Sequence, residues 1–345
     1  MVYFRYIQRG DDVVKKINGT QSTVYIDMRN QIVKKVATLR GRQEVLDQIE
    51  FYNSLELPVK SYFPEIIEYS SIEDPPFFSY KLINGDCLRD VLLNDMFDVR
   101  WANRLARVIN QIHKDIHSIH ICAPREEELK NIYSDRLNNR VVEAARLSSI
   151  TNLYSVDIVY QDKLFSSPIK GIEDIVNANF DSLIPEYICS THGQLGPSHI
   201  FIKPDSDKFC LIDPKGFGKL YDPVIDICKI GKAMVFATEW FEENKFSIDY
   251  SFSEKSLVIN DFEVFDYSRK RMSTLFFSMC NNIDFINSCK NGIQRLIAMM
   301  CVDLIGGLPY AYVAQGEKRM AAILLQIAFA HRLLSDSFDN DFSWK

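Results

Sequence analysis

The chain has 345 residues, of which 47% are hydrophobic and 25% are charged, and its net charge is −6. These values are ordinary for a globular protein with a sizeable core, so they exclude a disordered chain. An acidic chain also argues against nucleic-acid binding, which usually shows as a basic patch. It does not exclude a polyphosphate ligand, because a few local cations and Mg²⁺ can neutralise one.

Eight cysteines are scattered along the chain without a C-x-x-C pair, which favours reduced thiols in a cytoplasmic protein over a disulfide framework or a zinc site. The N-terminus has no basic segment followed by an apolar stretch, so no secretory signal is predicted. The most apolar late stretch, residues 296–314, is interrupted by an aspartate, two glycines and a proline. A membrane span needs about 20 continuous apolar residues, so none is predicted.

The first 83 residues are predicted to form a small strand-rich lobe, because apolar and polar residues alternate between turn signals. One helix over residues 41–55 interrupts the strands, with Val45, Ile49 and Tyr52 at helical spacing. The predicted strands cover residues 2–8, 13–18, 23–28, 31–37, 65–71 and 77–82.

The rest of the chain, residues 84–345, is predicted to be mainly helical. Helices are expected over residues 98–120 and 126–147 and over most of 226–334, which contains a strand-like patch at 246–264. A short strand is expected at 156–160. His113, His117 and His120 share one face of the first of these helices, and without an acid between the first two this pattern favours a polar helix face over a zinc site.

Residues 191–216 carry the densest set of chemically useful side chains. Strands are predicted at residues 200–203 and 209–212, joined by a turn, so a loop holding His192, Gln194 and His199 should lie beside Asp213. A carboxylate and an imidazole on adjacent backbones can share one cation, which suits a metal-bridged polyphosphate.

This segment resembles the catalytic and metal-binding segments of the aminoglycoside phosphotransferase (kinase-like) family. In that family His-Gly-Asp is followed after four residues by Asn or His, and then, after a hairpin, by Ile-Asp. The resemblance implies an α+β, bilobal protein-kinase-like fold, with a nucleotide-binding lobe of antiparallel sheet and one helix (1–83) and a larger helical lobe (84–345). It also implies Mg²⁺ held by Asp213 and His199, and ATP or GTP as the phosphoryl donor.

The resemblance assigns further roles within the loop and the helical lobe. His192 would orient the loop backbone, and Asp226, at the start of a helix, would brace the loop from behind. The motifs at 133–137, 212–216 and 226–230 are similar to a bacterial branch of the family that is associated with capsule and surface-sugar synthesis.

In the strand-rich lobe the resemblance implies a lysine on the strand 31–37 that binds phosphates. Only one of Lys34 and Lys35 can point inward; Lys34 is favoured because it follows two apolar residues, and Lys35 stays open. The acidic partner of this lysine is expected on the following helix, at Glu50 or Glu44.

Two further contacts with the nucleotide are expected in this lobe. Ser22 would donate to phosphate oxygens from the turn at 18–23. Backbone groups near Leu82 and Ile83 would face an adenine ring.

Gln194 occupies the position of the family's catalytic aspartate. Glutamine keeps an acceptor oxygen that can orient a hydroxyl, but it cannot take the proton near neutral pH. The leading hypothesis is an ATP- or GTP- and Mg²⁺-dependent phosphotransferase that acts on the hydroxyl of a small molecule, such as a sugar or sugar derivative. The alternatives are a nucleotide-binding pseudokinase that acts through partners and, third, an enzyme that transfers AMP.

Overall fold

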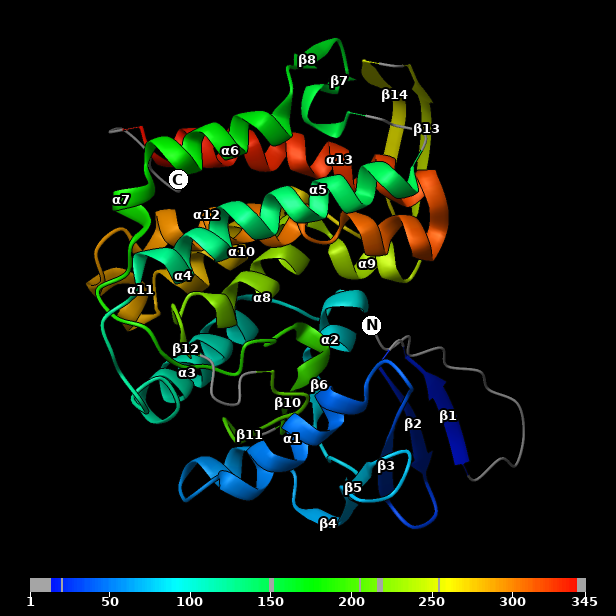
Figure 1. Cartoon of the computed structure of the whole chain (residues 1–345), viewed down its shortest axis with the longest axis vertical. Helices are drawn as coiled ribbons and strands as arrows, with labels where there is room; N and C mark the ends of the chain where they lie inside the picture. Colours follow the sequence, from blue (N-terminus) through cyan, green and yellow to red (C-terminus); the bar gives the residue numbers. More distant parts are fainter. Residues whose placement is uncertain are drawn as a thin grey trace.

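The computed structural model describes residues 14–19, 21–148, 152–204, 206–215, 220–253 and 255–339, except the side chains of 134–136. The chain folds into a small lobe built on a sheet and a larger lobe built mainly of helices (Figure 1). The predicted fold class, α+β with two lobes, is therefore confirmed.

The small lobe contains an antiparallel sheet of five strands in the order β1-β2-β3-β5-β4, counted over the described residues. The strand predicted at residues 2–8 lies outside those residues. Helix α1 packs against β3 and β5, because its buried face, which includes Val45, Ile49 and Tyr52, repeats at helical spacing. The elements are β1 (Val14–Asn18), β2 (Ser22–Asp27), β3 (Ile32–Ala37), α1 (Arg42–Ser54), η1 (Val59–Tyr62), β4 (Ile66–Ser70) and β5 (Phe77–Lys81).

The large lobe is a helical body with small sheets at its edges. Its helices are α2 (Leu88–Leu93), α3 (Val99–Asp115), α4 (Glu126–Lys130), η2 (Asn131–Asp135), α5 (Arg136–Leu147), η3 (Leu153–Ser155), α6 (Pro168–Ala178), α7 (Phe180–Leu183), η4 (Pro197–His199), α8 (Ile225–Phe236), α9 (Thr238–Glu242), α10 (Arg269–Cys280), α11 (Asp284–Ser288), α12 (Gly292–Ile305) and α13 (Leu308–Ser337). Its strands are β6 (Asp86–Cys87), β7 (Asp157–Tyr160), β8 (Lys163–Phe165), β9 (Cys189–Ser190), β10 (Ile200–Ile202), β11 (Phe209–Leu211), β12 (Leu220–Tyr221), β13 (Phe246–Phe252) and β14 (Ser256–Val264).

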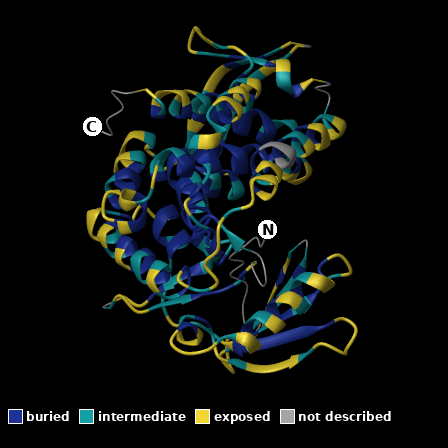
Figure 2. Cartoon of the chain, turned by 60° about the vertical axis from the view of Figure 1, so that its left-hand side comes forward, coloured by how far each residue is buried: buried dark blue, intermediate teal, exposed yellow. Residues whose placement is uncertain are grey.

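Helix α8 packs against η4 within the loop 191–199, and His117, on the turn that follows α3, forms a hydrogen bond with Asp226 of α8. Helix α3 begins at Asp98, whose side chain accepts a hydrogen bond from the backbone N–H of Trp101 at 3.0 Å, an N-cap that satisfies one of the free donors of the first turn. Helix α8 packs against α12 and α10 and is buried along almost its whole length. Figure 2 shows that the buried residues of the large lobe gather at its centre.

Two small sheets fix the ends of this loop. Strand β9 pairs with β12 on one side of it, and β10 pairs with both β11 and β6 on the other. Because β6 directly follows the small lobe, this pairing joins the start of the large lobe to the loop. A fourth sheet, β13-β14-β7-β8, lies at the end of the large lobe opposite the small lobe (Figure 1).

No single helix in the described part of the chain is long and apolar enough to cross a membrane. Helices α12 and α13 meet both conditions only when taken together, as a pair bent by 55°.

Candidate functional site

Asp226, in the first turn of α8, holds the backbone of the loop. Its carboxylate accepts the N–H of His192 at 2.8 Å and the N–H of Gly193 at 2.7 Å. It also accepts a third hydrogen bond from Nε2 of His117, on the turn that follows α3, at 3.0 Å. Asp226 is fully buried, and although burial alone would raise its pKa, the His117 hydrogen bond and the neighbouring donors lower it. The expected role of Asp226 as a brace matches this geometry.

Gly193 allows the sharp turn that this clamp requires. Its φ of 72° lies in the left-handed region, and a Cβ atom there would lie 3.0 Å from the carbonyl oxygen of Lys215. The N–H of Lys215 also donates to the carbonyl of His192 at 2.8 Å. The backbone that follows Asp213 therefore lies against the loop. A side chain at position 193 would be strained and crowded.

His192 is fully buried and links the loop to the strand that precedes Asp213. Its Nε2 lies 2.9 Å from the carbonyl oxygen of Ile212, which can only accept, so Nε2 carries the proton. Burial lowers the pKa of His192 to about 4, and the ring is neutral near pH 7. This position fits a loop-orienting role.

Asp213 and His199 face one another, as the sequence predicts. His199 Nε2 lies 3.8 Å from Asp213 Oδ2, and His199 Nδ1 lies 2.6 Å from the carbonyl oxygen of Gln194. Because that carbonyl can only accept, Nδ1 carries the proton and Nε2 presents its lone pair to the carboxylate. Burial lowers the pKa of His199, which keeps this lone pair free near neutral pH.

The Asp213 carboxylate is ionised in this setting. Burial opposes its charge, but Lys35 and then His199 lower its pKa to about 2. Its backbone φ of 58° is uncommon for a residue other than glycine, and such conformations tend to occur at functional sites.

Lys35 is the lysine that the sheet brings to the site. Its ammonium lies 2.6 Å from Asp213 Oδ1 and 3.0 Å from Gln48 Oε1, and the residue is 2% exposed. Lys34 points to the other face of β3, over the ring of Phe77 at 3.5 Å. The preference for Lys34 is therefore wrong, and the open alternative, Lys35, has the predicted position.

The prediction that this lysine has an acidic partner on α1 is also wrong. The side chain that meets Lys35 is the buried amide of Gln48. Glu50 is exposed on the other face of α1, and Glu44 lies 3.9 Å from Lys215 instead. An amide therefore stands where the family resemblance implies an acid.

The other contacts expected with the nucleotide are less well placed. Ser22 is 3% exposed, so its hydroxyl is buried in the small lobe and the predicted contact with phosphate is not supported. The backbone N–H of Leu82 donates to the carbonyl of Gln31 at 2.7 Å, which occupies one of the donors expected at the adenine ring. Contact between Ile83 and the ring stays a prediction.

Gln194 lies in the middle of the clamped loop and is half-buried. Its carbonyl oxygen accepts from His199 and from the N–H of Gly196 at 2.7 Å. The backbone of Gln194 is thus fixed by the same imidazole that faces Asp213.

His117 is a functional residue that the sequence interpretation missed. The helix-face interpretation expected a polar surface, yet His117 is 1% exposed and supports the Asp226 clamp. Histidine spacing along one helix could not reveal this, because Asp226 is more than 100 residues away in the chain.

The donor set fits one hard divalent cation. No group of three or more His, Cys, Asp or Glu side chains in the described ranges could hold a metal ion by itself. Mg²⁺ normally takes one or two carboxylates and completes its shell with water and substrate phosphates. Asp213 supplies the carboxylate and His199 a neutral nitrogen, a less usual donor for Mg²⁺, so phosphate oxygens would have to complete such a shell.

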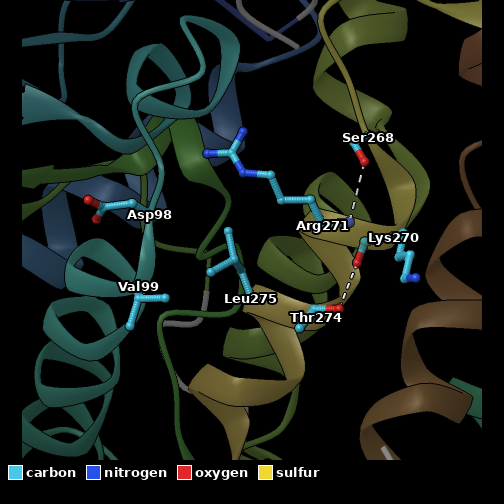
Figure 3. Close-up of a pocket in the computed structure, with 7 residues that line it drawn as sticks. All are labelled: Asp98, Val99, Ser268, Lys270, Arg271, Thr274 and Leu275. Carbon is cyan, nitrogen blue, oxygen red and sulfur yellow. Dashed lines mark hydrogen bonds between the residues drawn. The ribbon is translucent and has the colours of Figure 1, made fainter. Parts of the chain in front are cut away.

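A separate hollow of about 450 Å³ lies between the start of α3 and helix α10 (Figure 3). Its walls include Asp98 and Val99 on one side and Arg271 and Leu275 on the other. None of the lining residues belongs to the loop 191–199, so this hollow is not part of the site described above.

Comparisons with known proteins agree with this architecture. No family model matches the chain, and no curated protein matches its sequence. In structure it is similar to the GDP complex of wild-type aminoglycoside 2'-phosphotransferase-IIIa, with a TM-score of 0.54 and 14% identity, over 94% of each chain. The GDP complex of a point mutant of that protein matches with a TM-score of 0.56 and 13% identity, over 96% of this chain and 94% of that chain.

A thermostable mutant of aminoglycoside phosphotransferase APH(4)-Ia, in its apo form, matches with a TM-score of 0.53 and 10% identity, over 93% of this chain and 94% of that chain. At such low identity the similarity defines the fold alone. The chain therefore has the aminoglycoside phosphotransferase (kinase-like) fold, as its motifs predict.

Proposed function

We propose that the chain is a nucleotide-triphosphate-dependent phosphotransferase that acts on the hydroxyl of a small molecule. The observation that carries this proposal is the convergence of Lys35, Asp213 and His199, from two lobes, on one point beside a clamped loop. The GDP complexes of aminoglycoside 2'-phosphotransferase-IIIa, which share the fold, support a nucleotide as the ligand.

In this proposal Asp213 and His199 hold Mg²⁺, and Lys35 binds phosphate oxygens after leaving Asp213. The cation would neutralise charge on the transferred phosphoryl group. The acceptor oxygen forms a bond to the terminal phosphorus while the bond to the bridging oxygen breaks and the nucleoside diphosphate leaves. A sugar or sugar derivative remains the acceptor class that the motifs favour.

Gln194 orients the acceptor hydroxyl through its amide oxygen. It cannot take the proton near pH 7, so the proton leaves with the transferred phosphoryl group. Positioning and electrostatic stabilisation supply most of the rate in phosphoryl transfer, and a base contributes about 10²–10⁴. We therefore expect slow turnover.

The second candidate function is a nucleotide-binding pseudokinase. A specific observation favours it: amides stand at both Gln194 and Gln48, where the family resemblance implies two acids. A pseudokinase would bind the nucleotide at the same site without measurable transfer.

The first experiment tests the nucleotide site that both candidates require. Thermal unfolding is followed with ATP or GTP, each with and without Mg²⁺. A nucleotide at roughly 100 times its Kd should stabilise the protein by about 2.7 kcal/mol. Asp213→Asn should remove the Mg²⁺-dependent part, whereas Asp207→Asn, on the same hairpin and paired with Arg107 at 2.7 Å, should keep it. No stabilisation by either nucleotide would contradict both candidates.

The second experiment separates the two candidates. Release of nucleoside diphosphate is measured over neutral sugars, amino sugars, sugar acids and sugar phosphates. Acceptor-dependent release that Asp213→Asn abolishes supports the phosphotransferase, and binding without release supports the pseudokinase.

A further inference from the structure

Helix α8 exposes a single stripe next to the candidate metal site. Of its twelve residues only Lys229 and Lys232 are half-buried and the other ten are buried, and a spacing of three puts both lysines on one face. The helix begins with the clamp residue Asp226 and packs against η4, which ends at His199. Lys229, one turn after Asp226, therefore lies on the side of α8 that is close to the loop.

The electrostatics of His199 agree with this position. Burial lowers its pKa first, and the positive charge of Lys229 acts in the same direction. Burial lowers the pKa of Lys229 first, Asp303 raises it, and Lys232 and then Lys215, two residues after Asp213, lower it. Lys229 is thus within electrostatic reach of both the imidazole and the segment that follows the metal-ligand aspartate.

The two lysines of the stripe differ in their partners. Lys232 forms an ion pair with Asp303 of α12 at 2.5 Å. The Lys229 ammonium makes no hydrogen bond or ion pair with any residue that the structure describes. Asp303 attracts this ammonium, whereas Lys232 and Lys215 repel it. Because Asp303 is already paired with Lys232, an anionic ligand would be stabilised beside Lys229.

The carboxylates on the elements packed against α8 are already in ion pairs, with Arg89 shared by two of them. Arg89 pairs with Glu239 at 2.7 Å and with Glu243 at 2.6 Å, and Glu242 lies 3.6 Å from Arg319. With Asp303 paired to Lys232, each of these carboxylates has a cationic partner. A cationic acceptor would have to compete with Arg89, Arg319 or Lys232 for one of these carboxylates, which costs more than placing an anion beside Lys229.

Resting on the function proposed above, we propose that Lys229 binds an anionic group of the acceptor, so the acceptor is a hydroxylated anion. A sugar phosphate and a sugar carboxylate share this chemistry, and the ammonium can bind either as a point charge. The donor phosphates belong to the opposite side, where Lys35 reaches Asp213 from the sheet. Lys229 belongs to α8 of the large lobe and is therefore assigned to the acceptor.

Binding of four probes on one sugar frame tests this assignment. Glucose, glucosamine, glucuronate and glucose 6-phosphate are titrated calorimetrically into the full chain with Mg²⁺ and a nucleoside diphosphate, and orthophosphate serves as a minimal anion. The proteins are the parent, Lys229→Gln, Lys229→Arg and, as a matched control, Lys114→Gln, an exposed lysine of α3.

We expect at least one anionic probe to bind about tenfold or more tightly than glucose and glucosamine. Glucuronate and glucose 6-phosphate then distinguish a carboxylate from a phosphate. Lys229→Gln should remove the preference while nucleotide affinity stays unchanged, and Lys229→Arg and Lys114→Gln should retain it.

Three results would overturn the assignment: a preference for glucosamine, an anion preference that survives in Lys229→Gln, or no binding of any anionic probe including orthophosphate. Weaker nucleotide binding in Lys229→Gln would also overturn it, because the lysine would then belong to the donor. Failure of the parent to bind any nucleotide would instead reject the function on which this inference rests.

Discussion

The loop 191–199 and the inner face of the small lobe hold their charged groups in different ways. In the loop, Asp226 is buried among three donors and all of them are satisfied. On the sheet, Lys35 is shared between the neutral amide of Gln48 and the Asp213 carboxylate. The loop is fixed by its own partners, whereas the lysine depends on the candidate metal ligand.

The groups that position the loop and a cation therefore differ from the groups expected to take the acceptor proton and to hold the phosphate-binding lysine. The groups that position the loop and a cation are retained with their charges. Amides stand at the two places where the family resemblance implies acids, one for the acceptor proton and one for the lysine. In the proposed function the charged groups hold the nucleotide and its cation, and the two amides limit the rate of transfer.

An acid introduced at position 194 is expected to have the largest effect on this contrast. Gln194→Asp should raise the rate of phosphoryl transfer by about 10²–10⁴, because a base contributes that much. The rate is measured as acceptor-dependent release of nucleoside diphosphate. Gln194→Asn, which has the length of aspartate without its charge, is the control and should not accelerate transfer. If Gln194→Asp abolished turnover that the parent shows, the glutamine would be an adapted catalytic residue and the contrast would fail.

Removing the clamp tests the loop side of the comparison. Asp226→Ala leaves three buried donors without their acceptor, and we expect a loss of about 3–5 kcal/mol in the free energy of unfolding. Urea unfolding measures it. Asp261→Ala, an exposed aspartate on β14, should change stability by less than about 0.5 kcal/mol. Equal effects of the two substitutions would show that the clamp does not stabilise the protein.

An acid introduced at position 48 tests how Lys35 is held on the sheet. Gln48→Glu gives Lys35 a carboxylate partner and should free Asp213 for the metal. Mg²⁺ affinity of the nucleotide complex should rise by about tenfold, or about 1.4 kcal/mol. Gln43→Glu, at an exposed position of the same helix, should leave Mg²⁺ affinity unchanged. A weaker Mg²⁺ complex in Gln48→Glu would show that Lys35 does not compete for Asp213.

The smallest expected effect concerns Glu242, a carboxylate of α9 that lies near Glu239. Burial, and then the charge of Glu239, raise the pKa of Glu242 from 4.5 to about 7. The folded protein therefore holds this proton to higher pH than the unfolded chain, so the parent loses stability as pH rises from about 4.5 to 7. Glu242→Gln should remove that loss and be more stable than the parent at pH 8, on the order of 1 kcal/mol.

Thermal unfolding at pH 5 and pH 8 measures this effect. Glu263→Gln, an exposed site on β14, should follow the parent at both values. A parent whose stability does not fall between them, relative to Glu242→Gln, would contradict the raised pKa.

The sequence was sufficient where the contacts are local. His192, His199 and Asp213 belong to one loop and one hairpin, so their spacing alone predicts that they meet. Lys34 and Lys35 could not be separated, because both faces of β3 carry two apolar residues and the choice depends on which face α1 covers. His117 was missed because its partner Asp226 lies in a distant segment. Gln48 was missed because an acid was expected on the helix that carries it.

The central claim is that Asp213 and His199 hold one divalent cation together with a nucleotide. Pulsed electron paramagnetic resonance of Mn²⁺, substituted for Mg²⁺ in the nucleotide complex, tests it most directly because it detects a coordinated imidazole nitrogen. We predict a ¹⁴N coupling in the parent protein that is lost in His199→Gln and kept in the exposed-site variant His120→Gln. A nucleotide-bound Mn²⁺ without any nitrogen coupling in the parent would contradict the claim.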